Sequence, residues 1–121
     1  GFYFGMAFQM YDDILNLTGD ISETGKPRGN DIKEGIITIP FIMAMRKNTV
    51  FADKAYRIMA GKTVKDEDLK LIMEEIIKSG GIEDTRAWID RCLGKADAML
   101  KPLPDVPEKQ IFRDIMSTLK K

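Results

Sequence analysis

Two adjacent carboxylates, Asp12 and Asp13, stand in a strongly apolar stretch near the start of the chain. Over residues 2–17 apolar side chains fall on nearly every face of a predicted helix, and such a helix is normally buried. No lysine or arginine lies three or four residues from either aspartate, so no local ion pair is available. Because an unpaired buried carboxylate is costly, the sequence leaves two interpretations. Either a kink or a helix end opens the aspartates to water, or they line a water-filled cavity that holds a divalent cation.

The second interpretation predicts a magnesium site. Asp12 and Asn16 are four residues apart and share a helix face, and Asp13 lies about 100° around the axis. Hard oxygen ligands suit Mg²⁺, which binds a few carboxylates and keeps its other positions for water and phosphate. With no histidine and one cysteine, a zinc site or a histidine-activated nucleophile is implausible. Any chemistry must therefore use carboxylates, a metal ion, and lysine or arginine.

These residues belong to a longer ordered pattern that resembles the trans-isoprenyl (polyprenyl) diphosphate synthases. Residues 8–16 (FQMYDDILN) resemble their second aspartate-rich motif, FQxxDDxLD. Residues 24–35 (TGKPRGNDIKEG) resemble GKPxGxD(L/I)xEG, and residues 38–40 (TIP) resemble TxP. Residues 78–83 and 103–104 resemble the tail of the medium- and long-chain members. The resemblance covers the chain from end to end, but corresponds to the C-terminal part of such an enzyme.

The resemblance implies an activity and a set of site residues. The activity is the Mg²⁺-dependent head-to-tail (1'-4) condensation of an allylic prenyl diphosphate with isopentenyl diphosphate, in which Lys26 contacts the diphosphate leaving group. The implied metal ligands are Asp12, Asp13, Asn16 and Asp31, the catalytic residues are Asp12, Asp13 and Lys26, and the substrate-binding residues are Phe8, Gln9 and Lys26. Without the resemblance, Phe8 would be interpreted as a core residue, Lys26 as a solvated loop residue and Asp31 as a turn residue.

Two departures from the family pattern leave other functions open. Asn16 replaces the third acid of the motif, so the site has one negative charge fewer and should bind metal more weakly. Ile36 stands where many short-chain members have a second lysine. One alternative is therefore a non-catalytic subunit of a heteromeric prenyl diphosphate synthase. A helical interaction module without a ligand is another, and a terpene-cyclase relative is disfavoured because its second metal motif is of another type.

The elements that must position these residues are helices, because no stretch alternates with a period of two. Glycine and proline positions divide the chain into six predicted helices, at about 2–18, 38–47, 50–60, 66–78, 82–101 and 107–119, with a loop over 19–35. Asp66 is predicted to cap the fourth helix, and Trp88 and Cys92 to lie in the core. The predicted fold is an all-α helical bundle. By resemblance it is the C-terminal part of the isoprenoid synthase fold.

Composition narrows the class of protein. The 121 residues suffice for one modest domain, and 19 basic residues balance 19 acidic ones, so no net charge points to nucleic acid. Without a signal peptide or an apolar run near the length of a membrane span, we expect a cytoplasmic protein with no integral membrane segment. Residues 1–121 are expected to be the C-terminal segment of a synthase domain, cut from a larger protein. We expect a homo-oligomer that hides Phe2, Phe4 and Phe8.

Residues 1–121 alone should not catalyse prenyl transfer. The chain contains no first aspartate-rich motif, so half of the metal cluster expected from the family resemblance is missing. Incubation with farnesyl diphosphate, isopentenyl diphosphate and Mg²⁺ should therefore yield no elongated product. Detection of a longer prenyl diphosphate by chromatography would contradict this expectation.

Overall fold

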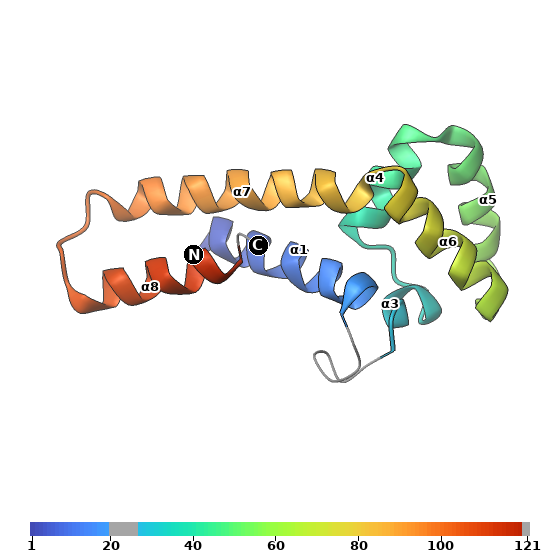
Figure 1. The fold of residues 1–121 in the computed structure, drawn as a ribbon, viewed down its shortest axis with the longest axis horizontal. Coiled ribbons are helices and arrows are strands. Elements are labelled where there is room, and N and C mark those ends of the chain that lie inside the picture. The colour runs from blue at the N-terminus through green and yellow to red at the C-terminus, as the bar shows by residue number, and fades with distance from the viewer. Residues whose placement is uncertain (20–26, 120–121) are drawn as a thin grey trace. The chain divides into compact units, whose positions relative to one another are not determined.

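The chain is all-α, as the sequence predicts, in a computed structural model that describes residues 1–19 and 27–119 (Figure 1). Every regular element within these two ranges is a helix. The helices are α1 (Phe2–Thr18), α3 (Asn30–Lys33), α4 (Ile39–Lys47), α5 (Thr49–Met59), α6 (Asp66–Lys78), α7 (Gly81–Leu100) and α8 (Pro107–Thr118). Among the described helices, none combines the length and the apolar character that crossing a membrane requires.

The chain is organised as two compact units. One combines the two ends of the chain, Gly1–Asp12 and Arg86–Lys121, and the other is the continuous segment Asp13–Thr85. The helices α1 and α7 each contribute residues to both units. The continuous unit therefore contains the second carboxylate of the sequence motif and all the residues up to the start of α7.

Helices α4, α5 and α6 form the core of the continuous unit, where each packs against the other two. Thr38 precedes the first turn of α4, Pro40 lies in that turn, and basic residues end the helix, as predicted. The rings of Phe41 and Phe51, both buried, lie 6.1 Å apart between α4 and α5. The apolar stripe along α6 is buried at Ile72 and Ile76 and ends in an exposed Ile77.

The predicted cap of α6 is shifted by one residue. The N-cap is Lys65, whose side chain makes no capping hydrogen bond, and Asp66 is the first helical residue. The Asp66 carboxylate instead accepts a hydrogen bond from the ammonium of Lys33. That hydrogen bond and the charge of Lys33 lower the pKa of Asp66 below its ordinary value. The prediction that Asp66 caps the helix is thus wrong: Asp66 is the first helical residue, and its carboxylate pairs with a distant lysine.

The junction between α6 and α7 depends on glycine. Gly80 has a φ of +82°, which L-residues other than glycine rarely adopt. At Gly81 a Cβ atom would lie 2.5 Å from the carbonyl oxygen of Pro40, a backbone atom of α4. Beside this junction the Lys47 ammonium donates to the carbonyl oxygen of Ser79, at 3.0 Å, and pairs with Asp84 at 2.8 Å. The start of α7 is therefore held in direct backbone contact with the start of α4.

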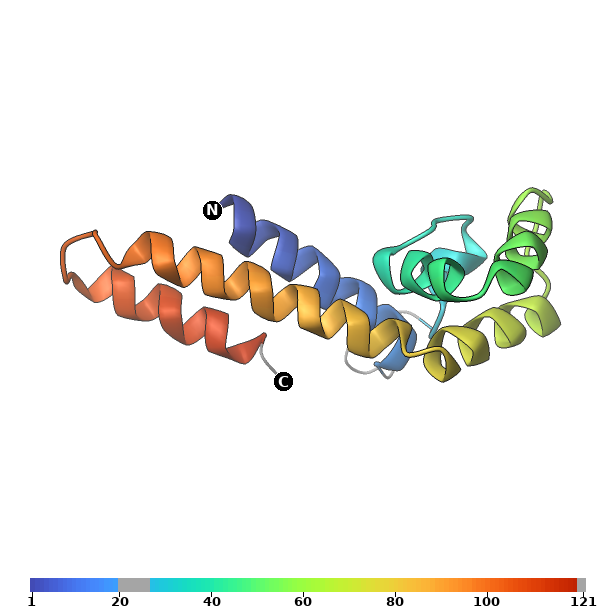
Figure 2. The same ribbon diagram turned by 90° about the horizontal axis from the view of Figure 1, so that it is seen from above.

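The other unit is built on an α7–α8 hairpin, in which α8 returns alongside α7 (Figures 1 and 2). The first residues of α1 pack onto this hairpin. The rings of Phe4 and Phe112 lie 4.8 Å apart, and the Lys95 ammonium lies 5.2 Å from the centre of the Tyr3 ring. The apolar stripe of α7 predicts a buried face of Ile89, Cys92, Leu93, Ala96 and Leu100; the first four are buried, whereas Leu100 at the end of the helix is half-buried.

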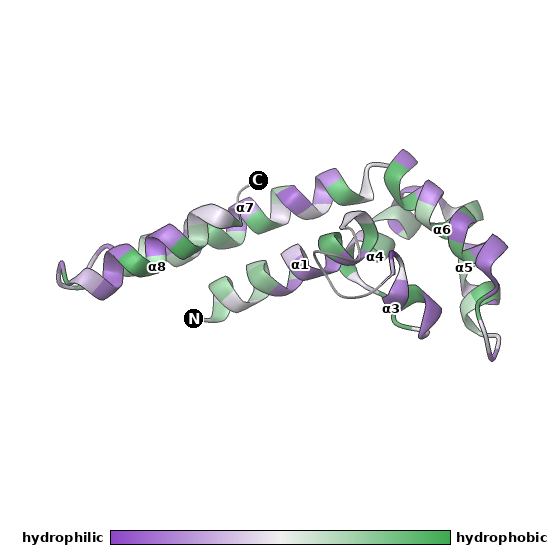
Figure 3. Ribbon diagram, turned by 60° about the horizontal axis from the view of Figure 1, so that its bottom comes forward, coloured by the Kyte–Doolittle hydropathy of each residue, from purple (hydrophilic) through white to green (hydrophobic). Residues whose placement is uncertain are grey.

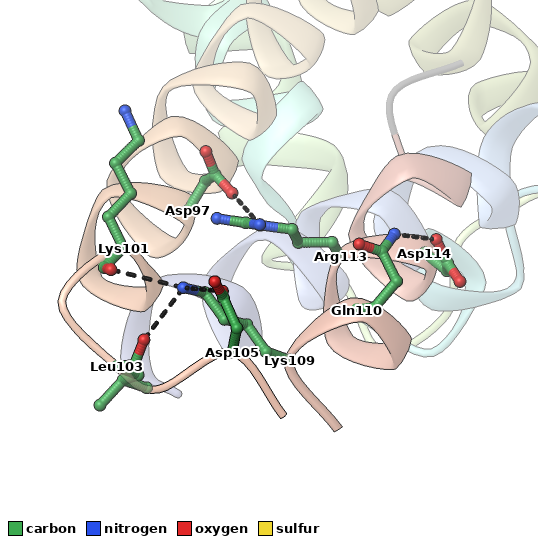
Figure 4. Close-up of polar contacts among 8 residues, drawn as sticks. All are labelled: Asp97, Lys101, Leu103, Asp105, Lys109, Gln110, Arg113 and Asp114. Atoms are coloured by element: carbon green, nitrogen blue, oxygen red, sulfur yellow. Dashed lines mark hydrogen bonds and ion pairs between the residues drawn. The ribbon is translucent and has the colours of Figure 1, made fainter. Parts of the chain in front are cut away.

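A buried lysine closes the turn of this hairpin (Figure 4). Lys109 is 8% exposed, and its ammonium donates to the carbonyl oxygens of Lys101 and Leu103, at 3.4 and 3.1 Å. The same nitrogen lies 3.2 Å from the carboxylate of Asp105. These partners satisfy the buried charge and the carbonyl groups that follow the end of α7.

Trp88 differs from the predicted core, and the apolar residues of α8 divide between buried and exposed positions. Trp88 is 42% exposed and carries the guanidinium of Arg91 at 5.0 Å from its ring centre. In α8, Met116 is buried whereas Ile111 is exposed, since the buried face of this helix is shared by apolar residues and the Lys109 stem. Cys92 is a buried free thiol, as predicted.

Two glycines of α7 should respond oppositely to alanine. Gly81→Ala should lower the free energy of unfolding, because the new Cβ atom would clash with the Pro40 backbone. Gly94→Ala is the matched control, because no atom lies within 4 Å of its Cβ position. Alanine there should raise the free energy of unfolding by about 0.5–1 kcal/mol through helix propensity. Urea denaturation followed by circular dichroism measures both; a Gly81→Ala variant as stable as the parent would contradict the close contact.

Candidate functional site

Helix α1 buries one face and leaves large apolar side chains exposed on others. The buried residues are spaced by three, four and three positions, as one helix face requires; they are Ala7, Met10, Ile14 and Leu17. Phe2 is 74% exposed and Phe8 is 54% exposed. Figure 3 shows apolar colouring concentrated where α1 begins. The neighbouring helices cover one face of α1, so Phe2 and Phe8 are left open, as expected for side chains that an oligomer would hide.

The exposed part of α1 includes the first carboxylate of the motif. Phe8, Gln9 and Asp12 are exposed, and spacings of three and four residues bring them onto one side of the helix. Because α1 continues without interruption to Thr18, Asp12 reaches water without a kink or a helix end. This side of the helix offers an aromatic ring, an amide and a carboxylate in succession.

The second carboxylate has a different environment. Asp13 lies one residue further along, about 100° around the axis, and is 5% exposed. It makes at least one polar or electrostatic interaction within the protein. Burial of an aspartate is tolerated when its carboxylate is paired or hydrogen-bonded. The two adjacent aspartates are thus an accessible one and a buried one.

The structure brings Asn16 together with Asp31, although they are 15 residues apart in sequence. The side-chain oxygen of Asn16 accepts a hydrogen bond from the backbone N–H of Asp31, at 3.2 Å. Its main-chain oxygen accepts one from the N–H of Gly29, at 2.8 Å. Sequence reasoning placed both residues in the site but missed this contact, because a hydrogen bond across a loop leaves no periodic signal.

Four of the predicted site residues, the metal ligands Asp12, Asp13, Asn16 and Asp31, all lie within the described part of the chain. Lys26 lies outside it. Within residues 1–19 and 27–119, no group of three or more His, Cys, Asp or Glu side chains is arranged to hold a metal ion. The accessible oxygen donor of α1 is Asp12. A single accessible carboxylate fits Mg²⁺, because Mg²⁺ uses one or two carboxylates together with substrate phosphates and water. It is too few donors for a site made of protein ligands alone.

Comparison with known proteins identifies the family. The polyprenyl synthetase family profile matches residues 1–76, which include the motifs at 8–16, 24–35 and 38–40. The chain belongs to the polyprenyl synthetase family. A curated relative in this family, heptaprenyl diphosphate synthase component 2 of Geobacillus stearothermophilus, is 34% identical over 115 residues, which cover 95% of this chain and 35% of the relative. Octaprenyl diphosphate synthase of Escherichia coli is 33% identical over 110 residues, covering 91% of this chain and 34% of that protein.

Solved structures of this family share the fold. Heptaprenyl diphosphate synthase from Staphylococcus aureus is 30% identical, with a TM-score of 0.87, over 98% of this chain and 36% of that one. Geranylgeranyl pyrophosphate synthase from Corynebacterium glutamicum was solved with calcium and isoprenyl diphosphate. It is 31% identical, with a TM-score of 0.78, over 98% of this chain and 36% of that one. This polyprenyl synthetase chain therefore has an isoprenoid synthase fold and spans about a third of the length of these relatives.

The two aspartates should differ in their effect on stability. Without metal, Asp12→Ala should raise the free energy of unfolding by about 0.5 kcal/mol, because alanine is the better helix former at an exposed position. Asp13→Ala should lower it by about 1–3 kcal/mol, because a buried polar partner is lost. Thermal and urea unfolding in the presence of a metal chelator measures both effects. Equal effects of the two substitutions would contradict the difference in burial.

Proposed function

We propose that this chain supplies the second aspartate-rich part of a trans-prenyltransferase. In the whole protein the reaction is the Mg²⁺-dependent head-to-tail condensation of an allylic diphosphate with isopentenyl diphosphate. The observation that carries this proposal is the exposed side of α1, where Phe8, Gln9 and Asp12 follow one another within the region matched by the family. The relatives named above as heptaprenyl and octaprenyl diphosphate synthases support the same reaction class.

The chemical character of α1 suits an amphiphilic substrate. A prenyl diphosphate has an apolar chain and a strongly anionic head. On α1 the exposed Phe2, Met6 and Phe8 precede the exposed Asp12 along the helix axis, with a rise of about 6 Å from Phe8 to Asp12. An apolar chain lying along the first part of α1 would bring its diphosphate to the carboxylate end. This arrangement supports substrate-binding roles for Phe8 and Gln9.

The site residues would act mainly on negative charge. We assign Asp12 and Asp13 as ligands of Mg²⁺, with Asp31 supporting the metal site. When bound, the cation would offset the negative charge that develops on the diphosphate as it leaves. Lys26 would neutralise the same leaving group. The proposed reaction needs no histidine as a general base, and the sequence contains no histidine.

A heteromeric assembly is the second candidate. The Geobacillus stearothermophilus relative is named component 2 of a heptaprenyl diphosphate synthase. A Bacillus subtilis relative has the same name and is 38% identical over 104 residues, which cover 86% of this chain and 29% of that protein. A homo-oligomer and a complex with a different subunit would each cover exposed apolar surface. A cytoplasmic location stays a prediction from the sequence.

Mg²⁺ together with a bisphosphonate should raise the melting temperature of the full-length protein that carries this chain. A ligand at 100 times its dissociation constant stabilises the folded state by about 2.7 kcal/mol. Asp12→Ala should abolish the rise, and Asp90→Ala, which removes an exposed carboxylate from α7, should preserve it. A full rise in the Asp12→Ala variant would place the ligand elsewhere and refute the proposed site.

Turnover separates the two candidates. The purified full-length protein should elongate an allylic diphosphate by itself if it is a complete synthase. Activity that requires a second, different polypeptide would identify a heteromeric component. A protein that neither binds the bisphosphonate nor supports turnover in any mixture would be the helical interaction module.

A further inference from the structure

We propose that Asn16 is a positioning residue, which fixes the segment 29–31 against the end of α1 and is not itself a metal ligand. This inference rests on the proposed function, in which Asp12, Asp13 and Asp31 form part of a metal–diphosphate site. It replaces the ligand role that the family resemblance implies for Asn16. The residues that carry it all belong to the continuous unit of the structure.

Both oxygens of Asn16 are used by the same short segment. The main-chain oxygen accepts from the Gly29 N–H at 2.8 Å, and the side-chain oxygen accepts from the Asp31 N–H at 3.2 Å. Asn16 is in the last turn of α1, where carbonyl groups have no partner within the helix. Because the N–H groups of Gly29 and Asp31 both bind this one residue, Asn16 fixes which residues of the segment face α1 as well as where the segment lies.

The opposite side of this segment is fixed by α6. Gly29 is buried with a φ of +74°, and a Cβ atom built on it would lie 2.7 Å from the sulfur of Met73 and 2.8 Å from Cδ1 of Leu69. The left-handed backbone favours glycine at this position. The segment is therefore held between α1, through Asn16, and the side chains of α6.

The backbone of Asp31 is bound at both of its polar groups. Its N–H donates to the Asn16 side chain, and its carbonyl oxygen accepts from the N–H of Ile36 at 2.8 Å. The next residue, Ile32, is 1% exposed and anchors the short helix α3. With its peptide groups fixed in this way, the direction in which the Asp31 carboxylate leaves the backbone is set in part by Asn16.

The chemistry of the acceptor distinguishes a positioning role from a ligand role. Asparagine and aspartate carry an oxygen at the same distance from the backbone, so either can accept the Asp31 N–H. Leucine has a similar size but no acceptor. Because an amide oxygen has two lone pairs, the hydrogen bond does not by itself exclude a metal contact, and the experiment must measure both properties.

Amide hydrogen exchange of the 121-residue chain, labelled with ¹⁵N, tests the positioning role directly. In the parent, the Asp31 amide should be protected. In Asn16→Leu it should exchange about five- to tenfold faster, which corresponds to the loss of one hydrogen bond, and Asn16→Asp should restore the protection. An Asp31 amide that exchanges in the parent at the rate of an unprotected amide would overturn the proposal, and this measurement requires no variant to fold.

Asn48 provides a matched control in the same unit. Its side-chain oxygen accepts from the Phe51 N–H at 3.1 Å, at the start of α5. Asn48→Leu should accelerate exchange at Phe51 and leave Asp31 unchanged, whereas Asn16→Leu should do the reverse. Acceleration at both amides in both variants would indicate general destabilisation and contradict a specific role for Asn16.

Metal binding decides between the two roles. Mn²⁺, a paramagnetic substitute for Mg²⁺, is titrated by electron paramagnetic resonance in the presence of inorganic pyrophosphate. Asp12→Ala should weaken Mn²⁺ binding far more than Asn16→Leu. The proposal is refuted if Asn16→Leu weakens Mn²⁺ binding as much as Asp12→Ala does and leaves hydrogen exchange at Asp31 unchanged. Asn16 would then be a metal ligand. This titration uses the full-length protein that carries this chain; if that protein binds no Mn²⁺, the proposed metal site fails, while the exchange rates still decide the role of Asn16.

Discussion

The central constraint on this structure is that α1 has more apolar surface than one packing face can cover. Its buried residues follow one stripe, and Phe2 and Phe8 stay exposed on other sides. The same helix carries Asp12 on its open side and Asp13 on a buried one. The candidate site residues are thus placed by the choice of which face packs, because a rotation of α1 by about 100° would bring Asp13 to the exposed position that Asp12 now occupies.

The sequence predicted local features well because their causes are local. Backbone geometry alone limits the helices at three places: Pro40 in the first turn of α4, Gly19 after α1 and Gly80 before α7. The exposure of Trp88 could not be predicted in this way. It depends on which neighbour covers each face, and helix periodicity does not contain that information.

The candidate site shows the same division between local and long-range information. The motif predicts Asp12 and Asn16 as site residues, and the family of the chain agrees with the motif. Their individual roles depend on contacts formed across a loop, such as the one from Asn16 to Asp31. A neutral residue at the third acidic position is compatible with the proposed site, because accepting a backbone N–H requires an oxygen atom and does not require a negative charge.

The division into a continuous and a discontinuous unit has a consequence for the order of folding. Residues 13–85 can find their partners within one stretch of chain, whereas residues 1–12 must pair with residues beyond 85. Closing so large a loop costs entropy before any contact is gained, so the continuous unit should form first. Within this chain, residues 1–12 would then be packed later than residues 13–85. Until residues 1–12 pack, their apolar side chains stay exposed, and the chain is then most prone to aggregate.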